Sequence, residues 1–215
     1  MKKPRVWLFR PLPHGSNQMP YFLKKSRIAL GYPIGKSLVK MTETAIKQDL
    51  RTHFGSDSGF KNLMRLRDAM NVGDLVVVPD DNLRDVYFCM VDDSGYIYEP
   101  SLDVDEEGSG FPHQRGVKWF FDKQPLLRTE LPQSLTESLR YPGTIADLSK
   151  HLATVANLLG LDLGLDEEPD GSTSVIDWSD LVELACDAIE RALKSQDHNV
   201  SLRAAEIVLS QSSQS

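Results

Sequence analysis

The sequence of 215 residues has few of the features that identify a protein class at first sight. It contains two cysteines, Cys89 and Cys186, which lie far apart in apolar stretches. This excludes a disulfide framework and favours a reducing compartment. No apolar run reaches about 18 residues, so we expect no membrane span. The basic N-terminus lacks the apolar region of a secretory signal. These absences predict a soluble, cytoplasmic protein.

Motifs for catalysis, metals and cofactors are also absent. The five histidines are scattered, and none stands at metal-ligand spacing from a cysteine. No serine lies in a Gly-x-Ser-x-Gly elbow, and no Asp/Glu-x-Lys pair follows Asp80 to complete a metal-dependent nuclease site. In Gly31–Ser37, three residues separate the glycines where a phosphate loop needs four, and Pro33 removes an amide donor. We therefore expect no catalytic residue, no metal and no cofactor.

Charge is distributed unevenly along the chain, although the net charge is only −7. Residues 1–67 carry 14 Lys or Arg and 3 Asp or Glu, residues 68–149 carry 6 and 16, and residues 150–215 carry 4 and 12. A basic N-terminal third can attract phosphates locally, because attraction depends on the facing surface. The alternative is charge pairing within the protein. The candidate phosphate contacts are Arg10, Lys24, Lys25, Lys36 and Lys40. We expect Lys24, Lys25, Arg27, Lys36 and Lys40 to present one positive face.

The pattern of apolar residues predicts an α+β domain. Short β-forming runs predict six strands, at residues 5–10, 27–31, 74–79, 86–91, 96–98 and 114–121. Asp92–Gly95 is predicted to be the turn of a hairpin between the fourth and fifth strands. Apolar residues at helical spacing and capping signals predict helices at residues 21–25, 42–54, 60–70, 131–140 and 144–159.

The composition changes in the last quarter of the chain. Residues 162–174 hold five carboxylates among Gly, Pro, Ser and Thr, and this predicts a linker. Amphipathic patterns then predict a helical pair, at residues 177–194 and 199–209. We therefore expect a folded domain at residues 1–160 and a C-terminal helical segment at residues 175–210. Residues 177–209 are the candidate contact to a protein partner or to a second copy of the chain.

Aromatic residues on or beside the predicted strands are the remaining positive signal. Trp7, Tyr32, Tyr98 and Trp119 are candidate walls of a pocket, and Arg115 is the candidate cation at its rim. Aromatic faces and a cation are what a flipped or single-stranded base requires. The alternative is that the rings fill the core, which we favour for Trp119. Tyr32 lies in a Gly-Tyr-Pro turn, so we expect its ring to be exposed at the mouth of the pocket, with Trp7 as one wall.

Several segments, taken in order, resemble one known family. They are Arg5–Arg10, Ile28–Tyr32, Leu66–Pro79, Tyr87–Tyr98, His113–Trp119 and Leu135–Leu148. Together they span residues 4–150 and resemble the N-terminal domain of Mrr-type restriction endonucleases, which is similar to the PUA-like superfamily with its EVE and ASCH domains. The resemblance implies a small curved β-barrel surrounded by helices. It also implies a pocket for a nucleobase, often a modified one.

The chain departs from this family in two ways. No nuclease motif follows residue 150, and Tyr32 stands where the family typically has tryptophan. The resemblance therefore implies a module without nuclease activity that reads a modified or flipped nucleobase in restriction, defence or nucleic-acid metabolism, with DNA favoured over RNA. Two alternatives stay open. One is an adaptor or nuclease-complex subunit whose C-terminal helices recruit an effector, and the other is an enzyme built on the same barrel.

Overall fold

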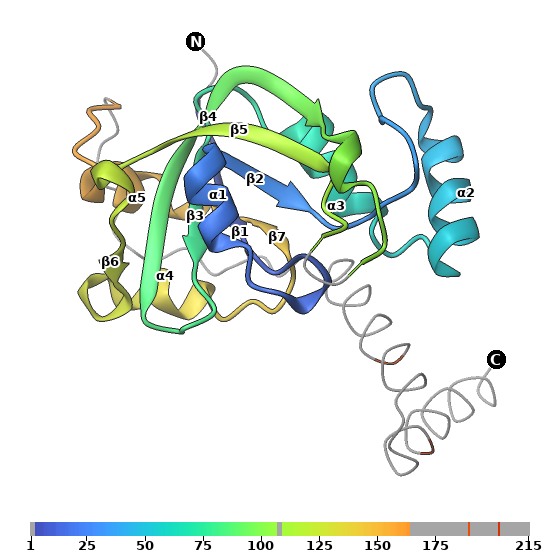
Figure 1. Ribbon diagram of the computed structural model, residues 1–215. Helices are drawn as coiled ribbons and strands as arrows, with labels where there is room; N and C mark the ends of the chain where they lie inside the picture. Colours follow the sequence, from blue (N-terminus) through green and yellow to red (C-terminus); the bar gives the residue numbers. More distant parts are fainter. Residues whose placement is uncertain (1–2, 107–108, 164–188, 190–201, 203–215) are drawn as a thin grey trace, which may run out of the picture. The chain divides into compact units, whose positions relative to one another are not determined.

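The computed structural model describes residues 3–106 and 109–163, together with Ile189 and Leu202 (Figure 1). Residues 3–163 belong to one compact unit, Met1–Gly171. Apart from Ile189 and Leu202, the predicted C-terminal helices at 177–194 and 199–209 lie outside the described residues, as does nearly all of the predicted linker.

Seven strands form one mixed sheet in the described part of the chain. They are β1 (Val6–Phe9), β2 (Arg27–Leu30), β3 (Leu75–Pro79), β4 (Asp85–Tyr98), β5 (His113–Trp119), β6 (Leu126–Leu127) and β7 (Ile145–Asp147). The order is β2-β5-β4-β3-β1-β7, with β6 paired to β4. Strands β1 and β3 are parallel, and the other pairs are antiparallel. The predicted α+β class is confirmed, but this sheet has two ends and does not close into a barrel.

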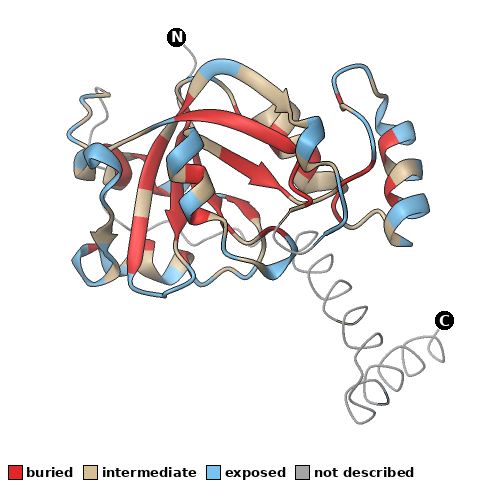
Figure 2. Cartoon of the chain, in the orientation of Figure 1, coloured by how far each residue is buried: buried red, intermediate tan, exposed pale blue. Residues whose placement is uncertain are grey.

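Helices cover both faces of the sheet, so its central strands are apolar on both sides (Figure 2). In β1, Trp7 and Phe9 join one apolar cluster, and Val6 and Leu8 join the other. We call these sides the Trp7 face and the Leu8 face. The Trp7 face packs residues of α1 (Met19–Lys25), α2 (Glu43–Phe54) and α3 (Phe60–Met64), and the Leu8 face packs residues of α4 (Gln133–Ser138) and α5 (Leu152–Leu158).

The predicted helices at 21–25, 42–54 and 131–140 are present with small shifts at their ends. In α2, the Thr42 side chain accepts a hydrogen bond from the Ala45 N–H at 3.3 Å and so caps the first turn. Gly55 follows the helix with a φ of +76°, a left-handed conformation that favours glycine. The helix predicted at 60–70 is α3 followed by a π-helical turn at Arg65–Ala69.

The predicted hairpin at Asp92–Gly95 is wrong, because residues 85–98 form one long strand. Strand β5 pairs with β4 on both sides of this segment, at Val91–Val117 and at Tyr96–Arg115. Four residues of β4, at 92–95, therefore lie opposite the single residue Gly116 of β5. The turn-forming residues therefore make a bulge and do not reverse the chain. Gly116 makes room for it, since a Cβ there would overlap the Ser94 hydroxyl and the Asp92 carboxylate.

The helix predicted at 144–159 begins only at Leu152. Ile145–Asp147 forms strand β7 instead, pairing antiparallel with β1 so that Phe9 faces Ile145 and Trp7 faces Asp147. The backbone N–H and C=O groups on this outer edge of β1 need hydrogen-bond partners. Pairing with that edge overrides the helical spacing of the apolar residues in this segment. The Ser149 hydroxyl extends the contact by accepting a hydrogen bond from the Val6 N–H at 3.1 Å.

Candidate functional site

The candidate pocket residues are spread along strand β5 and do not gather at one place. Tyr98 pairs with His113 at the start of β5, whereas Trp119 pairs with Cys89 at its end. Six residues of strand separate these positions, which corresponds to about 20 Å. Tyr32 lies at the His113 end, because its carbonyl accepts a hydrogen bond from His113 Nε2 at 2.9 Å. The structure therefore brings Tyr32 and Tyr98 together and places Trp119 elsewhere.

Trp7 does not form the wall of an open pocket, because its side chain is 2 % exposed and lies in the core. The indole Nε1–H donates to Asp74 Oδ2 at 2.9 Å, and the other carboxylate oxygen accepts from the Arg5 N–H. This aspartate, which follows a glycine in the sequence, ties the start of β1 to the start of β3. The Trp7 ring therefore has a structural role. Its place on a predicted strand was equally compatible with a binding role.

Arg115 does not reach a rim either. Its side chain is 7 % exposed, and the guanidinium donates to the carbonyls of Leu66 and Arg67, each at 3.1 Å, in the π-helical turn. Burial lowers the pKa of Arg115, and the negative charges of nearby aspartates partly oppose this. The π-helical turn displaces carbonyls from the regular helical pattern, and Arg115 satisfies two of them.

The chain after β2, residues 31–41, is a loop held by side chains from several elements. We call it the recognition loop. His113 donates to the Tyr32 carbonyl, the Gly35 N–H donates to Asp103 Oδ1 at 3.0 Å, and the Leu38 N–H donates to the Tyr96 hydroxyl at 3.3 Å. Arg67 then donates to the carbonyls of Leu38 and Met41, at 2.9 and 3.1 Å. A loop with this many anchors has its conformation fixed by the protein's own side chains.

His113 is the centre of these contacts and is fully buried. The Tyr32 carbonyl can only accept a hydrogen bond, so Nε2 carries the proton and Nδ1 accepts from the Tyr96 hydroxyl at 2.6 Å. Burial lowers the pKa of His113 to about 4, so the imidazole is neutral at pH 7. The ring stacks on Tyr96, and Tyr98 lies tilted against it, both with centroids 6.0 Å away. The result is a layer of aromatic rings beneath the recognition loop.

Tyr98 and Asp103 connect this layer to the following loop. The Tyr98 hydroxyl donates to Asp103 Oδ2, while Oδ1 of the same carboxylate accepts from Gly35. Burial, and then the hydrogen bond to Asp103, raise the pKa of Tyr98 to about 12. Asp103 therefore accepts the hydrogen bond of the Gly35 amide, which a phosphate in a phosphate loop would need. This agrees with the spacing of the two glycines, which does not fit a phosphate loop.

The ring of Tyr32 is half-buried and packed on two sides. It lies edge-on to Phe54 of α2, with centroids 6.0 Å apart, and a Cβ on Gly59 would overlap it. The expectation of a freely exposed ring is therefore wrong, because α2 and the segment after it supply neighbours that the sequence did not place there. Tyr32 is half-buried as a whole, and Gly35 and Lys36, three and four positions further along the same loop, are exposed.

The candidate phosphate contacts also divide between different places. Lys36 and Lys40 are exposed on the recognition loop, and Lys36 forms an ion pair with Asp49 at 3.1 Å. Lys24 and Lys25 precede β2, whereas the recognition loop follows it, so the two pairs lie at opposite ends of that strand. Arg10 is half-buried.

Arg10 acts on the protein backbone. Its guanidinium donates to the carbonyls of Leu139 and Tyr141 just after α4, at distances from 2.6 to 3.2 Å. Burial, and then the charge of Arg128, lower the pKa of Arg10. The single positive face expected from the sequence is therefore divided into separate regions.

The residues that organise the recognition loop are not among the candidates expected from the sequence. Tyr96 and Asp103 each hold one backbone group of the loop, and Arg67 holds two. One signal was present, since Tyr96, Tyr98 and the aligned His113 lie at alternating positions of paired strands. The prediction of a hairpin between residues 91 and 96 concealed this signal, because it separated Tyr96 and Tyr98 from the strand before them.

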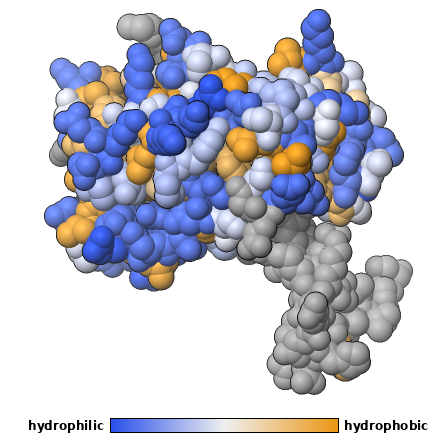
Figure 3. Space-filling model, in the orientation of Figure 1, coloured by the Kyte–Doolittle hydropathy of each residue, from blue (hydrophilic) through white to orange (hydrophobic). Residues whose placement is uncertain are grey.

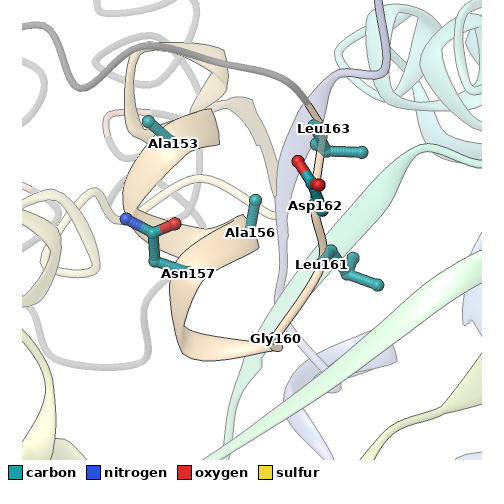
Figure 4. Close-up of a pocket in the computed structure, with 7 residues that line it drawn as sticks. All are labelled: Ala153, Ala156, Asn157, Gly160, Leu161, Asp162 and Leu163. Atoms are coloured by element: carbon teal, nitrogen blue, oxygen red, sulfur yellow. The ribbon is translucent and has the colours of Figure 1, made fainter.

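A surface hollow of about 540 Å³ lies between α5 and the chain that follows it (Figure 4). Its lining residues are Ala153, Ala156, Asn157, Gly160, Leu161, Asp162 and Leu163. None of the candidate site residues borders it, and its lining carries neither an aromatic ring nor a cation. This hollow is therefore not the base pocket that the sequence led us to expect.

Comparison with protein families gives one match. A family model described as a domain of unknown function, DUF8426, matches residues 14–140, from the loop after β1 to the end of α4. The chain belongs to the DUF8426 family. The match includes the recognition loop and all of β5. No curated protein matches the sequence.

Within the described residues, no three His, Cys, Asp or Glu side chains gather as metal ligands would. In the same part of the chain, no helix combines the length and the apolarity needed to cross a membrane.

Proposed function

We propose that this DUF8426 member is a cytoplasmic nucleic-acid-binding module that recognises a modified or flipped nucleobase at the recognition loop, with DNA favoured over RNA. The proposal includes a PUA-like plan, in which the long, bulged β4 and its partner β5 curve across the front of the unit (Figure 1). It also includes a setting in restriction, defence or nucleic-acid metabolism, as the family resemblance implies.

The anchoring of the recognition loop is the observation that supports this function best. Specific readers hold their contact groups rigidly, so that binding does not have to order them. Here, buried or half-buried side chains from β4, β5, the π-helical turn and the loop that carries Asp103 fix the recognition loop at five backbone groups. The loop carries the half-buried Tyr32 ring and the exposed Lys36 and Lys40. An aromatic face beside cations suits a base and its flanking phosphate.

Binding of fluorescent oligonucleotides, measured by anisotropy, tests the proposal. The probes are a single strand and duplexes with and without one modified cytosine. We expect Tyr32→Leu to weaken binding by about five- to a hundredfold, because leucine keeps apolar contact with Phe54 but offers no face for stacking. Tyr32→Phe should bind nearly as well as the parent.

A matched control separates this effect from general damage. Tyr141→Ala truncates another half-buried tyrosine, which packs on the Leu8 face and is remote from the recognition loop. It should leave binding unchanged. Equal binding by the parent and Tyr32→Leu, with both proteins shown to be folded by circular dichroism, would contradict base recognition at this loop.

A further inference from the structure

The end of β5 leads into a turn with an uncommon backbone. Phe121, Asp122 and Lys123 have φ values of +52°, +49° and +67°, so three successive residues other than glycine are left-handed. Such a turn is strained for L-residues, and only aspartate among the three tolerates it well. Strained backbone that persists is a reason to ask what its side chains do. We call Phe121–Lys123 the left-handed turn.

The left-handed turn lies against the C-terminal end of α1. Lys123 Nζ donates to the Leu23 carbonyl at 2.6 Å, and the Val117 N–H donates to the Ser26 carbonyl at 3.0 Å. Arg27 of β2 pairs with Gly116 of the antiparallel β5, so Ser26 lies opposite Val117. The next residue on each segment is a lysine, Lys25 before Ser26 and Lys118 after Val117. Two segments almost 100 residues apart in sequence therefore bring their lysines to one place.

Four lysines define this region, which we call the lysine surface: Lys24, Lys25, Lys118 and Lys123. All four are exposed, and within the described residues none has a carboxylate at ion-pair distance. The dipole of α1 favours cations in its last turn, which accounts for Lys24 and Lys25. It does not account for Lys118. The surface over α1 is strongly hydrophilic (Figure 3).

Aromatic rings border the lysine surface. Phe121 is 40 % exposed and packs one edge against Phe88, with centroids 6.5 Å apart. Trp119 is half-buried beside Tyr87, and its indole N–H is without a hydrogen-bond acceptor in the described part of the chain. Packing against Phe88 therefore uses one edge of Phe121 and leaves much of its surface exposed, on a strained turn beside lysines that have no carboxylate partner in the described residues.

We propose that the lysine surface binds single-stranded nucleic acid, with phosphates on the lysines and a base stacked on Phe121. This proposal rests on the proposed function, and it adds a second contact region at the opposite end of β5 from the recognition loop. Unpaired cations repel each other until an anion neutralises them, and a strand of phosphates does so along its length. The exposed ring favours a nucleic acid over an acidic protein, because every base presents a face for stacking.

Salt-dependent binding to a fluorescent single-stranded DNA of about 16 nucleotides, the upper end of common site sizes, tests this proposal. Replacing two neighbouring lysines, in Lys25→Gln/Lys118→Gln, should lower the log–log salt slope by about 1.4 and the affinity by at least about tenfold. The control Arg140→Gln/Lys150→Gln makes the same change in net charge at exposed sites elsewhere and should leave the slope unchanged. Phe121→Ala should reduce affinity by about five- to a hundredfold with no change in slope.

The outcomes separate this proposal from base recognition at Tyr32. If Tyr32→Leu weakens binding while the double lysine variant binds like the parent, the lysine surface is not a contact and the proposed function stands. If the lysine variant weakens binding and Tyr32→Leu does not, the surface is a contact without base reading. Equal effects of the lysine variant and its control would overturn the proposal. So would tighter binding of poly-glutamate than of DNA through the same lysines, which would indicate an acidic protein partner.

Discussion

Protonation of His113 should destabilise the fold between pH 6.5 and pH 4. The imidazole is fully buried, and its two nitrogens are already used by the Tyr96 hydroxyl and the Tyr32 carbonyl. A second ring proton would break the hydrogen bond that Nδ1 accepts and would place a charge in the interior. The Asp103 carboxylate is the charge that acts in the opposite direction, raising the pKa of His113, but burial is the larger effect.

The size of this effect follows from the two pKa values. In the unfolded chain His113 should titrate near 6.5, whereas in the folded protein its pKa is about 4. Because the folded value is the lower one, the unfolded state takes up the proton first as the pH falls. Stability is therefore complete above pH 6.5 and decreases toward pH 4, by about 3 kcal/mol in total at about 1.4 kcal/mol for each pKa unit.

Urea unfolding at several pH values measures this loss, with His113→Gln as the reference. Glutamine can donate to the Tyr32 carbonyl and accept from Tyr96 but does not titrate in this range, so its stability should vary less with pH. The difference between the two proteins isolates His113 from the carboxylates that titrate nearby. Nuclear magnetic resonance of the parent gives an independent test, because the His113 ring should show no titration above pH 5. A midpoint near 6.5 in the folded protein, or identical pH dependence of the two proteins, would refute the reasoning.

Two further predictions concern stability at pH 7. Trp7→Phe should lower the free energy of unfolding by about 1–3 kcal/mol, because it removes the indole donor from the buried Asp74 carboxylate. Unchanged urea midpoints would show that this bond contributes nothing. Asp122→Ala should lower the free energy of unfolding by about 1 kcal/mol, because alanine is strained in the left-handed conformation that aspartate tolerates. An unchanged urea midpoint would show that the aspartate does not relieve the strain of this turn.

The sequence predicted most strands of the sheet because apolar and β-branched runs are a local signal. Leu75–Pro79 was placed within one residue, since a strand buried on both faces is apolar throughout. The segments that failed depend on remote partners. Ile145–Asp147 became a strand because β1 offered it an edge, and residues 92–95 became a bulge because β5 runs past them on both sides. Neither partner is visible in the local pattern.

The candidate site was harder to predict than the fold, because a residue type does not show which way its side chain faces. Trp7 and Arg115 carry chemistry suited to a base pocket, yet each satisfies buried backbone or carboxylate groups. Tyr32 follows the second strand as predicted, but Phe54 and Gly59, which pack its ring, come from a helix and the segment after it. Lys118 was assigned to a strand without any indication that α1 would place Lys25 beside it.

The position of β1 between β3 and β7 decides which fragment of this protein can be produced on its own. The family match runs from residue 14 to residue 140, so a fragment cut at those limits would lack both β1 and β7. Strand β3 would then be an outer edge, with its unpaired N–H and C=O groups open to other chains, and such a fragment should aggregate. During synthesis, β1 likewise waits for β7, more than 130 residues later, before its second edge is covered. A domain excised for binding studies should therefore begin before Val6 and extend beyond α5.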